Sequence, residues 1–304
     1  RSCGNDFYEK EDMCMKGVII ARRRIGENCP PFIVAEMSGN HNQSLRRALN
    51  IVDEAARVGV HALKIQTYTA DTMTLNIKKK GFLIKDKASL WKGMSLYQLY
   101  QRAHTPWQWH ERIFKRCKRL GLIGFSTPFD TTAVDFLESL GVPCYKIASF
   151  ENVDIPLIRK VAATGKPVII SSGMALSKEM KESICAARDA GCKDIIVLKC
   201  TSSYPASNEG SNLRSIPYMR EIYKCHIGLS DHTLGLGAAI ASIAFGACLI
   251  EKHFTLSRKD KGVDAAFSLE PNDMNTLVIE TKKAWQSLGE VTLGPTKEEK
   301  KMLA

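Results

Sequence analysis

Short apolar runs alternate with amphipathic segments from Phe32 onward, and this alternation limits the possible folds more than any other feature of the chain. Each apolar run is followed by a segment with helical spacing. The expected strands are 32–36, 62–66, 122–125, 144–148, 168–170, 195–199, 227–229 and 249–253. Alternating β and α segments predict a parallel sheet. Eight units over about 250 residues favour a closed (β/α)8 TIM barrel over an open doubly wound sheet.

The segments between and before these strands complete the expected architecture. Helices are expected at 44–58, 106–120, 131–140, 155–163, 177–190, 213–223, 235–246 and 272–288. Residues 67–104 are too long for an ordinary connection and predict a lid or binding loop. Residues 17–27 predict a small hairpin, so we divide the chain into an N-terminal extension over 1–30 and a barrel over 31–295. The first strand is not followed by GxGxxG, which argues against a dinucleotide-binding fold.

Composition excludes some classes of protein and leaves others open. The sequence has no run of about 18 apolar residues, so no membrane span is expected. Its ten cysteines include no CxxC pair, and its first residues lack a secretory signal, which predicts reduced thiols in a cytoplasmic protein. A net charge of +11 is compatible with nucleic-acid binding, but no zinc-finger or RNA-binding signature accompanies it. An anionic small substrate is the alternative use of this charge.

Two of the expected strands end in histidine, at His232 and His253. In a parallel barrel both histidines stand at the C-terminal rim, where barrel enzymes carry their chemistry. Two converging imidazoles are a plausible pair of ligands for one divalent metal, although a single histidine more often only caps its strand. Acidic neighbours, Asp231 and Glu251, favour the metal interpretation.

Polar residues are expected at almost every other strand end, where unpaired polar groups would cost free energy in a purely structural barrel. They include Glu36, Lys64, Gln66, Thr127, Lys146, Ser149, Glu151, Ser171, Ser202, Tyr204, Ser230 and Asp264. Lysines and hydroxyl groups from several strands suit an anion that carries a phosphate. Lys64 or Lys146 could instead form a Schiff base, as in an aldolase. The histidine pair favours a metal-dependent reaction.

Nine motifs at these strand ends resemble the sialic acid synthase family, and the match extends in register from Phe32 to Pro295. They are AEMSGNHN, LKIQTYTADTMTL, STPFD, YKIASFE, IISSGM, KCTSSYP, GLSDHT, EKHFT and GVDAAFSLEP. The sequences TYTADTMTL, SLWKGMSLYQLYQRAHTPWQWH and SFEN are most similar to the branch of the family that makes pseudaminic acid.

The resemblance implies a condensation of phosphoenolpyruvate with an open-chain amino sugar, 2,4-diacetamido-2,4,6-trideoxy-altrose in that branch. N-acetylneuraminate and legionaminate synthases of the same family act on other amino sugars and remain alternatives. His232 and His253 would hold a divalent Mn, Mg or Co ion, and Glu36 would act near the attacking centre. Phosphoenolpyruvate would contact Lys64, Thr127, Lys146, Ser149, Ser171 and Ser230. The sugar would contact Gln66, Glu151, Tyr204 and Asp264, while Ser202 stands where the family commonly has asparagine.

The resemblance also carries an expectation about assembly. Family members usually have a further C-terminal antifreeze-like domain that completes the neighbouring subunit's site in a homodimer. Residues 296–304 would be the start of the linker to that domain. A homodimer of the longer protein is therefore expected, with no nucleic-acid or membrane partner.

Overall fold

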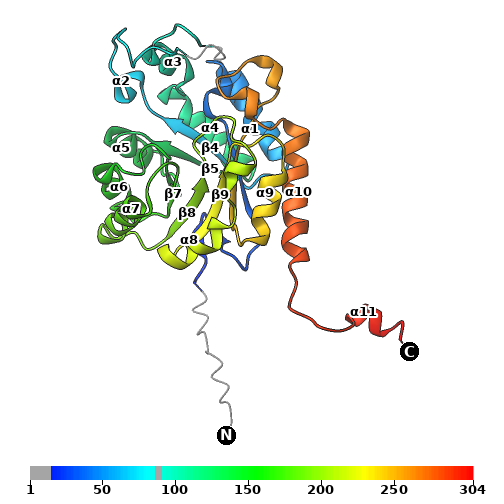
Figure 1. Ribbon diagram of the computed structural model, residues 1–304. Coiled ribbons are helices and arrows are strands. Elements are labelled where there is room, and N and C mark those ends of the chain that lie inside the picture. Colours follow the sequence, from blue (N-terminus) through cyan, green and yellow to red (C-terminus); the bar gives the residue numbers. More distant parts are fainter. Residues whose placement is uncertain (1–14, 86–90, 304) are drawn as a thin grey trace.

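Eight parallel strands form a closed barrel in a computed structural model that describes residues 15–85 and 91–303 (Figure 1). The barrel order is β10-β3-β4-β5-β6-β7-β8-β9. The strands are β3 (Phe32–Glu36), β4 (Ala62–Thr67), β5 (Ile123–Pro128), β6 (Tyr145–Ile147), β7 (Val168–Ser171), β8 (Ile195–Cys200), β9 (His226–Asp231) and β10 (Leu249–His253). The (β/α)8 barrel predicted from the alternation is confirmed.

Helices surround the barrel and join successive strands (Figure 1). They are α1 (Leu45–Arg57), α2 (Ala70–Met73), α3 (Leu96–Ala103), α4 (Trp107–Arg119), α5 (Thr131–Ser139), α6 (Ile155–Ala162), α7 (Ser177–Asp189), α8 (Ser215–Tyr223), α9 (Gly237–Ala244) and α10 (Pro271–Ser287), with α11 (Lys297–Lys300) in the tail. Side-chain caps begin several of them. Ser44, for example, accepts a hydrogen bond from the backbone N–H of Arg47 at the start of α1.

Side chains on each strand alternate between the barrel interior and the surrounding helices, as a period of two requires. Phe32, Val34, Ala62, Phe125 and Leu249 belong to one buried apolar cluster inside the barrel. A second cluster lies between the outer faces of the strands and the helices. Near the carboxyl ends of the strands, the inward positions become polar. The apolar layers therefore close the lower part of the barrel and leave a polar mouth at the C-terminal rim.

The predicted N-terminal hairpin is present and closes the opposite end of the barrel. β1 (Val18–Ile20) pairs antiparallel with β2 (Arg23–Ile25). Val18, Ile20 and Ile25 are buried in the same cluster as the inward residues of the strands. Burial of these apolar side chains favours the closed arrangement and excludes water from the N-terminal end.

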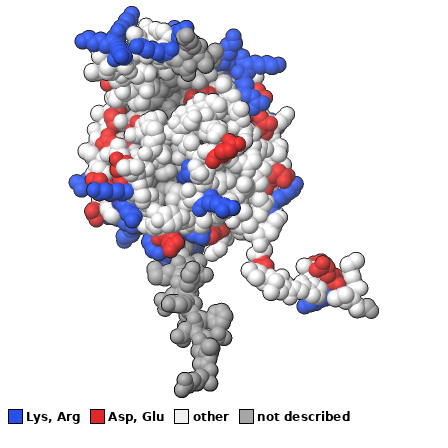
Figure 2. All heavy atoms as spheres, in the orientation of Figure 1, with Lys and Arg blue, Asp and Glu red and all other residues white. Residues whose placement is uncertain are grey.

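The long connection between β4 and α4 carries α2 and α3 and lies at the rim (Figure 1). Residues 86–90 of the predicted lid fall outside the described part of the chain. Lys78, Lys79 and Lys80 on this connection are exposed. Figure 2 shows lysine and arginine side chains grouped at the end of the molecule that carries α2 and α3. On this face, basic side chains thus gather close to the mouth of the barrel.

Membrane and redox expectations concern the same described residues. Within 15–85 and 91–303, no helix combines the length and apolar character that a membrane crossing requires. The eight cysteines in these ranges are free thiols, and most of them are buried. Cys3 and Cys14 lie outside the described residues.

Candidate active site

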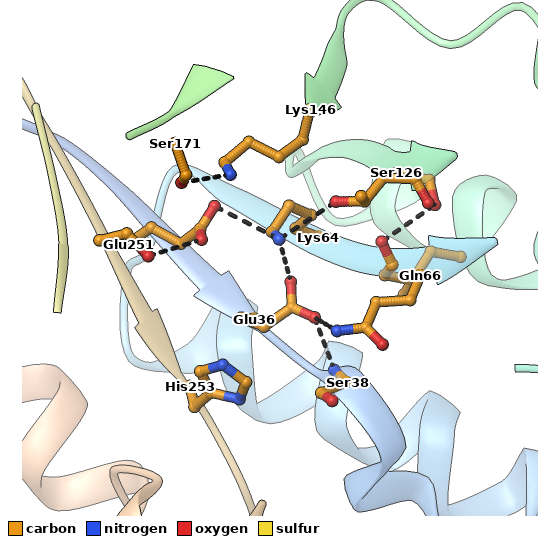
Figure 3. Close-up of polar contacts among 12 residues, drawn as sticks. Glu36, Ser38, Lys64, Gln66, Ser126, Lys146, Ser171, Glu251 and His253 are labelled. Atoms are coloured by element: carbon orange, nitrogen blue, oxygen red, sulfur yellow. Dashed lines mark hydrogen bonds and ion pairs between the residues drawn. The ribbon is translucent and has the colours of Figure 1, made fainter. Parts of the chain in front are cut away.

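Lys64 lies at the centre of the polar mouth, on the inward face of β4 (Figure 3). Its Nζ is 2.9 Å from Glu36 Oε2 and 3.4 Å from Glu251 Oε2. It also donates a hydrogen bond to Thr127 Oγ1, at 3.3 Å. The neighbouring Gln66 donates through Nε2 to Glu36 Oε1, at 3.1 Å. Parallel register brings these side chains together, because Glu36 pairs with Lys64 and Gln66 pairs with Thr127 in the barrel.

Burial and charge act in opposite directions on the pKa values of this cluster. Burial raises the pKa of Glu36 to about 7, although the ammonium group of Lys64 opposes the shift. Burial would also raise the pKa of Glu251, but Lys64 and Lys146 outweigh it and hold this pKa below its ordinary value. Burial lowers the pKa of Lys64, yet Glu251 and Glu36 together raise it above its usual range. Lys64 therefore remains an ammonium ion, and Glu36 is the carboxylate in the cluster that exchanges a proton near neutral pH.

A second buried lysine stands beside this cluster on β6. Lys146 Nζ donates to Ser171 Oγ at 2.5 Å and to the carbonyl oxygen of Ile147 at 3.0 Å. Burial lowers the pKa of Lys146, and Glu251 opposes this effect. Ser230 Oγ donates to Glu251 Oε1 at 3.0 Å. Two lysines and three hydroxyl groups thus face one space inside the mouth, as an anionic ligand requires.

The two rim histidines lie close together at the ends of β9 and β10. Their ring centroids are 5.4 Å apart, with the rings inclined at 60°. His232 Nδ1 is 3.0 Å from the carbonyl oxygen of Thr201. Because a carbonyl oxygen can only accept, this contact places a proton on Nδ1, so that in the neutral ring Nε2 carries the lone pair. Tyr204 and Phe267 contact both rings and enclose them.

These histidines fit a metal ion as two ligands of an incomplete site. Nδ1 of His253 is buried and has no hydrogen-bond partner in the described part of the chain. Its nearest acidic neighbour is Asp264, whose Oδ2 lies 3.5 Å away. Across residues 15–85 and 91–303, no three His, Cys, Asp or Glu side chains converge as a metal site. A metal held here would therefore take its remaining ligands from substrate or water, which is typical of a catalytic site.

Ser149, Ser202 and Tyr204 occupy the mouth on the side of β6 to β8. Gly173 approaches Ser149 and Ser202 closely: its φ is +50°, and a Cβ there would lie 2.4 Å from Ser149 Cβ and 3.0 Å from Ser202 Oγ. Ser202 Oγ is buried without a hydrogen-bond partner in the described part of the chain. Side-chain hydroxyl groups without a partner at a binding site are available to a ligand.

Glu151 and Asp264 take different positions at the rim. Burial raises the pKa of Glu151 to about 7, and its Oε2 has no hydrogen-bond partner among the described residues. It forms no hydrogen bond with the other predicted site residues in that part of the chain. Asp264 Oδ2 accepts a short hydrogen bond from Ser38 Oγ, and Ser38 N donates to Glu36 Oε1 at 3.1 Å. Asp264 is thereby connected to Glu36, whereas Glu151 stands apart.

The structure corrects one part of the metal argument and adds one residue. The sequence predicts that Asp231 supports a metal beside His232, but its side chain points away from the mouth. Its Oδ2 accepts from Lys252 Nζ at 2.7 Å in a fully buried ion pair. Glu251, in contrast, points inward, forms an ion pair with Lys64 and opposes the lowered pKa of Lys146 through its charge. Period-two alternation from His253 along β10 could have indicated that Glu251 is inward and Lys252 outward.

Comparisons with known proteins agree with this geometry. Residues 51–292 match the NeuB family. Pseudaminic acid synthase from Helicobacter pylori is 44% identical over 261 residues, which cover 86% of this chain and 76% of that protein. The N,N'-diacetyllegionaminic acid synthase from Legionella pneumophila is 33% identical, with coverage of 87% and 75%.

A solved structure supports the same relationship at the level of the fold. The crystal structure of N-acetylneuraminic acid synthetase from Leptospira borgpetersenii superposes with a TM-score of 0.84 and 30% identity, and the match covers 95% of each chain. A family match over most of the chain, together with relatives that are 44% and 33% identical over 261 and 268 aligned residues, is decisive. The chain belongs to the NeuB family.

Proposed function

We propose that this protein condenses phosphoenolpyruvate with open-chain 2,4-diacetamido-2,4,6-trideoxy-altrose to give pseudaminic acid and phosphate. The observation that carries the proposal is the buried pair of lysines, Lys64 and Lys146, beside two imidazoles at the mouth of a closed barrel. The similarity to the pseudaminic acid synthases of Helicobacter pylori and Campylobacter jejuni, at 44% and 40% identity, supports the choice of sugar.

The phosphoenolpyruvate site is formed by cationic and hydroxyl groups that converge from several strands. Lys64, Thr127, Lys146, Ser149, Ser171 and Ser230 form this set. In a site that excludes water, two fixed ammonium groups bind a phosphate and a carboxylate more strongly than exposed lysines would. The same groups stabilise the charge that develops when phosphate leaves, because they are already oriented before the reaction begins.

The amino sugar occupies the space between this anion site and the two histidines, where Gln66, Glu151, Ser202, Tyr204 and Asp264 contact it. Carbon 3 of phosphoenolpyruvate attacks the aldehyde carbon, whose oxygen takes a proton and becomes a hydroxyl group, and positive charge develops at carbon 2. Water adds to carbon 2 and loses a proton, and the resulting hemiketal phosphate forms the ketone as the bond between carbon 2 and the phosphate oxygen breaks. Glu36, whose pKa is raised to about 7, accepts the proton of that water as a general base.

His232 and His253 are the residues that would hold a divalent Mn, Mg or Co ion. Such an ion supplies Lewis-acid polarisation of the aldehyde oxygen. The contact between His232 Nδ1 and the carbonyl oxygen of Thr201 orients one imidazole, as hydrogen bonds to metal-bound histidines commonly do. We further propose that the protein acts as a cytoplasmic homodimer, without a nucleic-acid partner.

A product assay tests the proposed reaction. Phosphoenolpyruvate is incubated with 2,4-diacetamido-2,4,6-trideoxy-altrose, its legionaminate-type isomer or N-acetylmannosamine, and the products are identified by mass and by NMR. We expect phosphate release and a nine-carbon acid from the first sugar, with loss of activity in chelator and recovery with Mn. Full activity in chelator, with borohydride trapping of Lys64 or Lys146, would instead identify a Schiff-base aldolase.

Two variants test the assignment within the site. Lys146→Ala should weaken phosphoenolpyruvate binding much more than sugar binding, because its ammonium group faces the anion site. His232→Ala should remove metal-dependent turnover and leave the fold intact by circular dichroism. Equal weakening of phosphoenolpyruvate and sugar binding in Lys146→Ala would reject the role of Lys146 in the anion site. Unchanged turnover in His232→Ala would reject His232 as a metal ligand.

A further inference from the structure

The connection between β4 and α4 is fixed at both of its ends by buried hydrogen bonds. Where it begins, Thr67 Oγ1 lies 2.8 Å from His110 Nε2. Where it ends, Thr105 Oγ1 lies 3.2 Å from His41 Nε2. Trp107 Nε1 donates across the two ends to the carbonyl oxygen of Tyr68, at 3.3 Å. These hydrogen bonds hold the two ends of the connection together. The aromatic residues next to them therefore have a defined position over the mouth.

Tyr68 and Phe129 continue the inward-facing layers of the barrel one step above the candidate active site. Tyr68 follows Gln66 by two residues, and Phe129 follows Thr127 by two. The strand pairing extends this far, because Phe129 N donates to the carbonyl oxygen of Thr67 at 3.3 Å. The two rings meet edge to face, with centroids 5.2 Å apart. The side of the mouth formed by β4 and β5 is thus aromatic directly above Gln66 and Thr127.

Tyr100 extends this surface from α3. Its ring meets Tyr68 edge to face at 5.8 Å. Tyr68, Tyr100 and Phe129 together form what we call the aromatic wall. Neither phenol hydroxyl forms a hydrogen bond with another residue in the described ranges. Burial and then the charge of Asp264 raise the pKa of Tyr68, and burial and then Glu151 raise that of Tyr100. Both hydroxyls therefore remain protonated beside carboxylates of the predicted sugar site, where they can donate to a ligand.

The position of the wall around the barrel determines which part of a sugar it meets. In the barrel order, β5 is separated from β9 by three strands in one direction, namely β4, β3 and β10. In the other direction β6, β7 and β8 separate β5 from β9, so these two strands lie on opposite sides of the barrel. The histidines that would receive the aldehyde end stand on β9, opposite β5, and on β10, which has β3 between it and β4. A sugar that extends from His232 across the mouth therefore directs its far carbons towards Phe129 after β5 and towards the Tyr68 ring that contacts it.

We propose that the aromatic wall recognises the acetamido group at carbon 4 of the sugar. The rings of Tyr68 and Phe129 cover the acetyl methyl group, and the phenol hydroxyls of Tyr68 and Tyr100 form hydrogen bonds with the amide. This inference rests on the proposed function and assigns specificity-determining residues to it. A site that pairs with a substrate amide discriminates strongly against an analogue without it, because its polar groups are then left unpaired.

Steady-state kinetics with two sugars test the assignment. One sugar is the 2,4-diacetamido substrate, and the other is its analogue with a hydroxyl group at carbon 4. Tyr68→Phe and Tyr100→Phe should each lower kcat/KM for the diacetamido sugar by about 10-fold or more, and change it less than about 2-fold for the analogue. The KM for phosphoenolpyruvate should not change. Tyr97→Phe on the same helix is the matched control, since its hydroxyl donates to Asp71 at 2.9 Å on the outer side.

Each outcome of this experiment decides one question. A selective loss for the diacetamido sugar in both variants, with Tyr97→Phe behaving as wild type, supports the wall. Equal losses for both sugars, a raised KM for phosphoenolpyruvate, or unchanged kinetics would overturn it while leaving the proposed reaction intact. If the wild-type protein forms product from neither sugar, the proposed function fails, and the wall assignment fails with it.

Discussion

Lys64 owes its role to the two carboxylates that accompany it inside the barrel. A lone buried ammonium group would lose its proton, because burial disfavours the charged form. Glu36 and Glu251 reverse that tendency, and Gln66, Thr127 and Ser230 hold the oxygens and the nitrogen of the cluster in place. The cluster is thus arranged before any substrate binds, both for an anion and for a proton transfer. Keeping several charges out of water costs free energy in the folded protein.

Glu36 should determine how the reaction depends on pH. Its pKa is raised to about 7, so the carboxylate that acts as a base is lost as the pH falls below that value. We expect kcat/KM of the wild-type protein to decrease below about pH 7. Glu36→Gln should react slowly at every pH between about 5 and 9 and should lack this decrease.

Glu151→Gln is the control, because burial raises the pKa of Glu151 to about the same value. If the decrease in kcat/KM below about pH 7 disappears in Glu151→Gln but persists in Glu36→Gln, Glu151 rather than Glu36 is the general base.

The buried pair of Asp231 and Lys252 should matter for stability rather than for metal binding. Lys252→Met leaves the buried carboxylate of Asp231 with hydrogen bonds from Thr233 but without its cation, and should cost about 3–5 kcal/mol of unfolding free energy. The double variant Asp231→Asn with Lys252→Met should lose less than the single variant, because no unpaired charge remains. Urea unfolding of the purified variants measures both values. A larger loss in the double variant would contradict the argument.

Strand β9 needs glycine at position 228 because its neighbours approach too closely for a side chain. A Cβ at Gly228 would lie 2.5 Å from the carbonyl oxygen of Leu249 and 2.7 Å from Leu198 Cδ2. This strand runs from His226 to Asp231, longer than the expected 227–229, because its ladder extends to Cys200 on one side and Lys252 on the other. The strand that presents Ser230 and His232 is therefore tightly fixed between β8 and β10.

Gly228→Ala should destabilise the protein by about 1–3 kcal/mol through overpacking. Gly237→Ala is the matched control, because nothing lies within 4 Å of a Cβ there. Gly237 opens α9, and alanine favours the helix by up to about 1 kcal/mol. Chemical denaturation separates the two results. Equal stability of both variants would show that β9 can move away from Leu249.

At the scale of the whole molecule, the hairpin and the strands enclose one apolar interior below the active site. Neutral histidines that are buried or partly buried make this fold sensitive to acid. Burial lowers the pKa values of His41, His61 and His110 to about 4. The unfolded chain therefore binds more protons than the folded chain between about pH 4 and pH 6.5, and stability falls as the pH decreases through this window.

His61 offers a direct test of this acid sensitivity. Its Nδ1 accepts from the backbone N–H of Ile33 at 2.8 Å and joins β3 to the start of β4. From pH 7 to pH 5, His61 alone should account for a loss of about 2 kcal/mol in unfolding free energy. His61→Gln retains an acceptor and should lose correspondingly less over the same interval. Urea unfolding at the two pH values gives the comparison; an identical loss in the variant would remove His61 as a cause.

The sequence by itself determined the barrel and the location of its polar residues. Eight apolar runs, each followed by a helical segment, specify the alternation through hydrophobic periodicity, which is a local property. The same periodicity locates the strand ends, and with them Lys64, Lys146, His232 and His253 at one rim.

Only the tertiary structure decided how these residues pair. Glu251 on β10 pairs with Lys64 on β4, and Asp231 turns away from His232 to meet Lys252. Register between strands that are distant in the sequence sets these contacts. The aromatic wall depends in the same way on a helix folded back from a long connection. Such partners are brought together by chain packing, which the local pattern of residues does not encode.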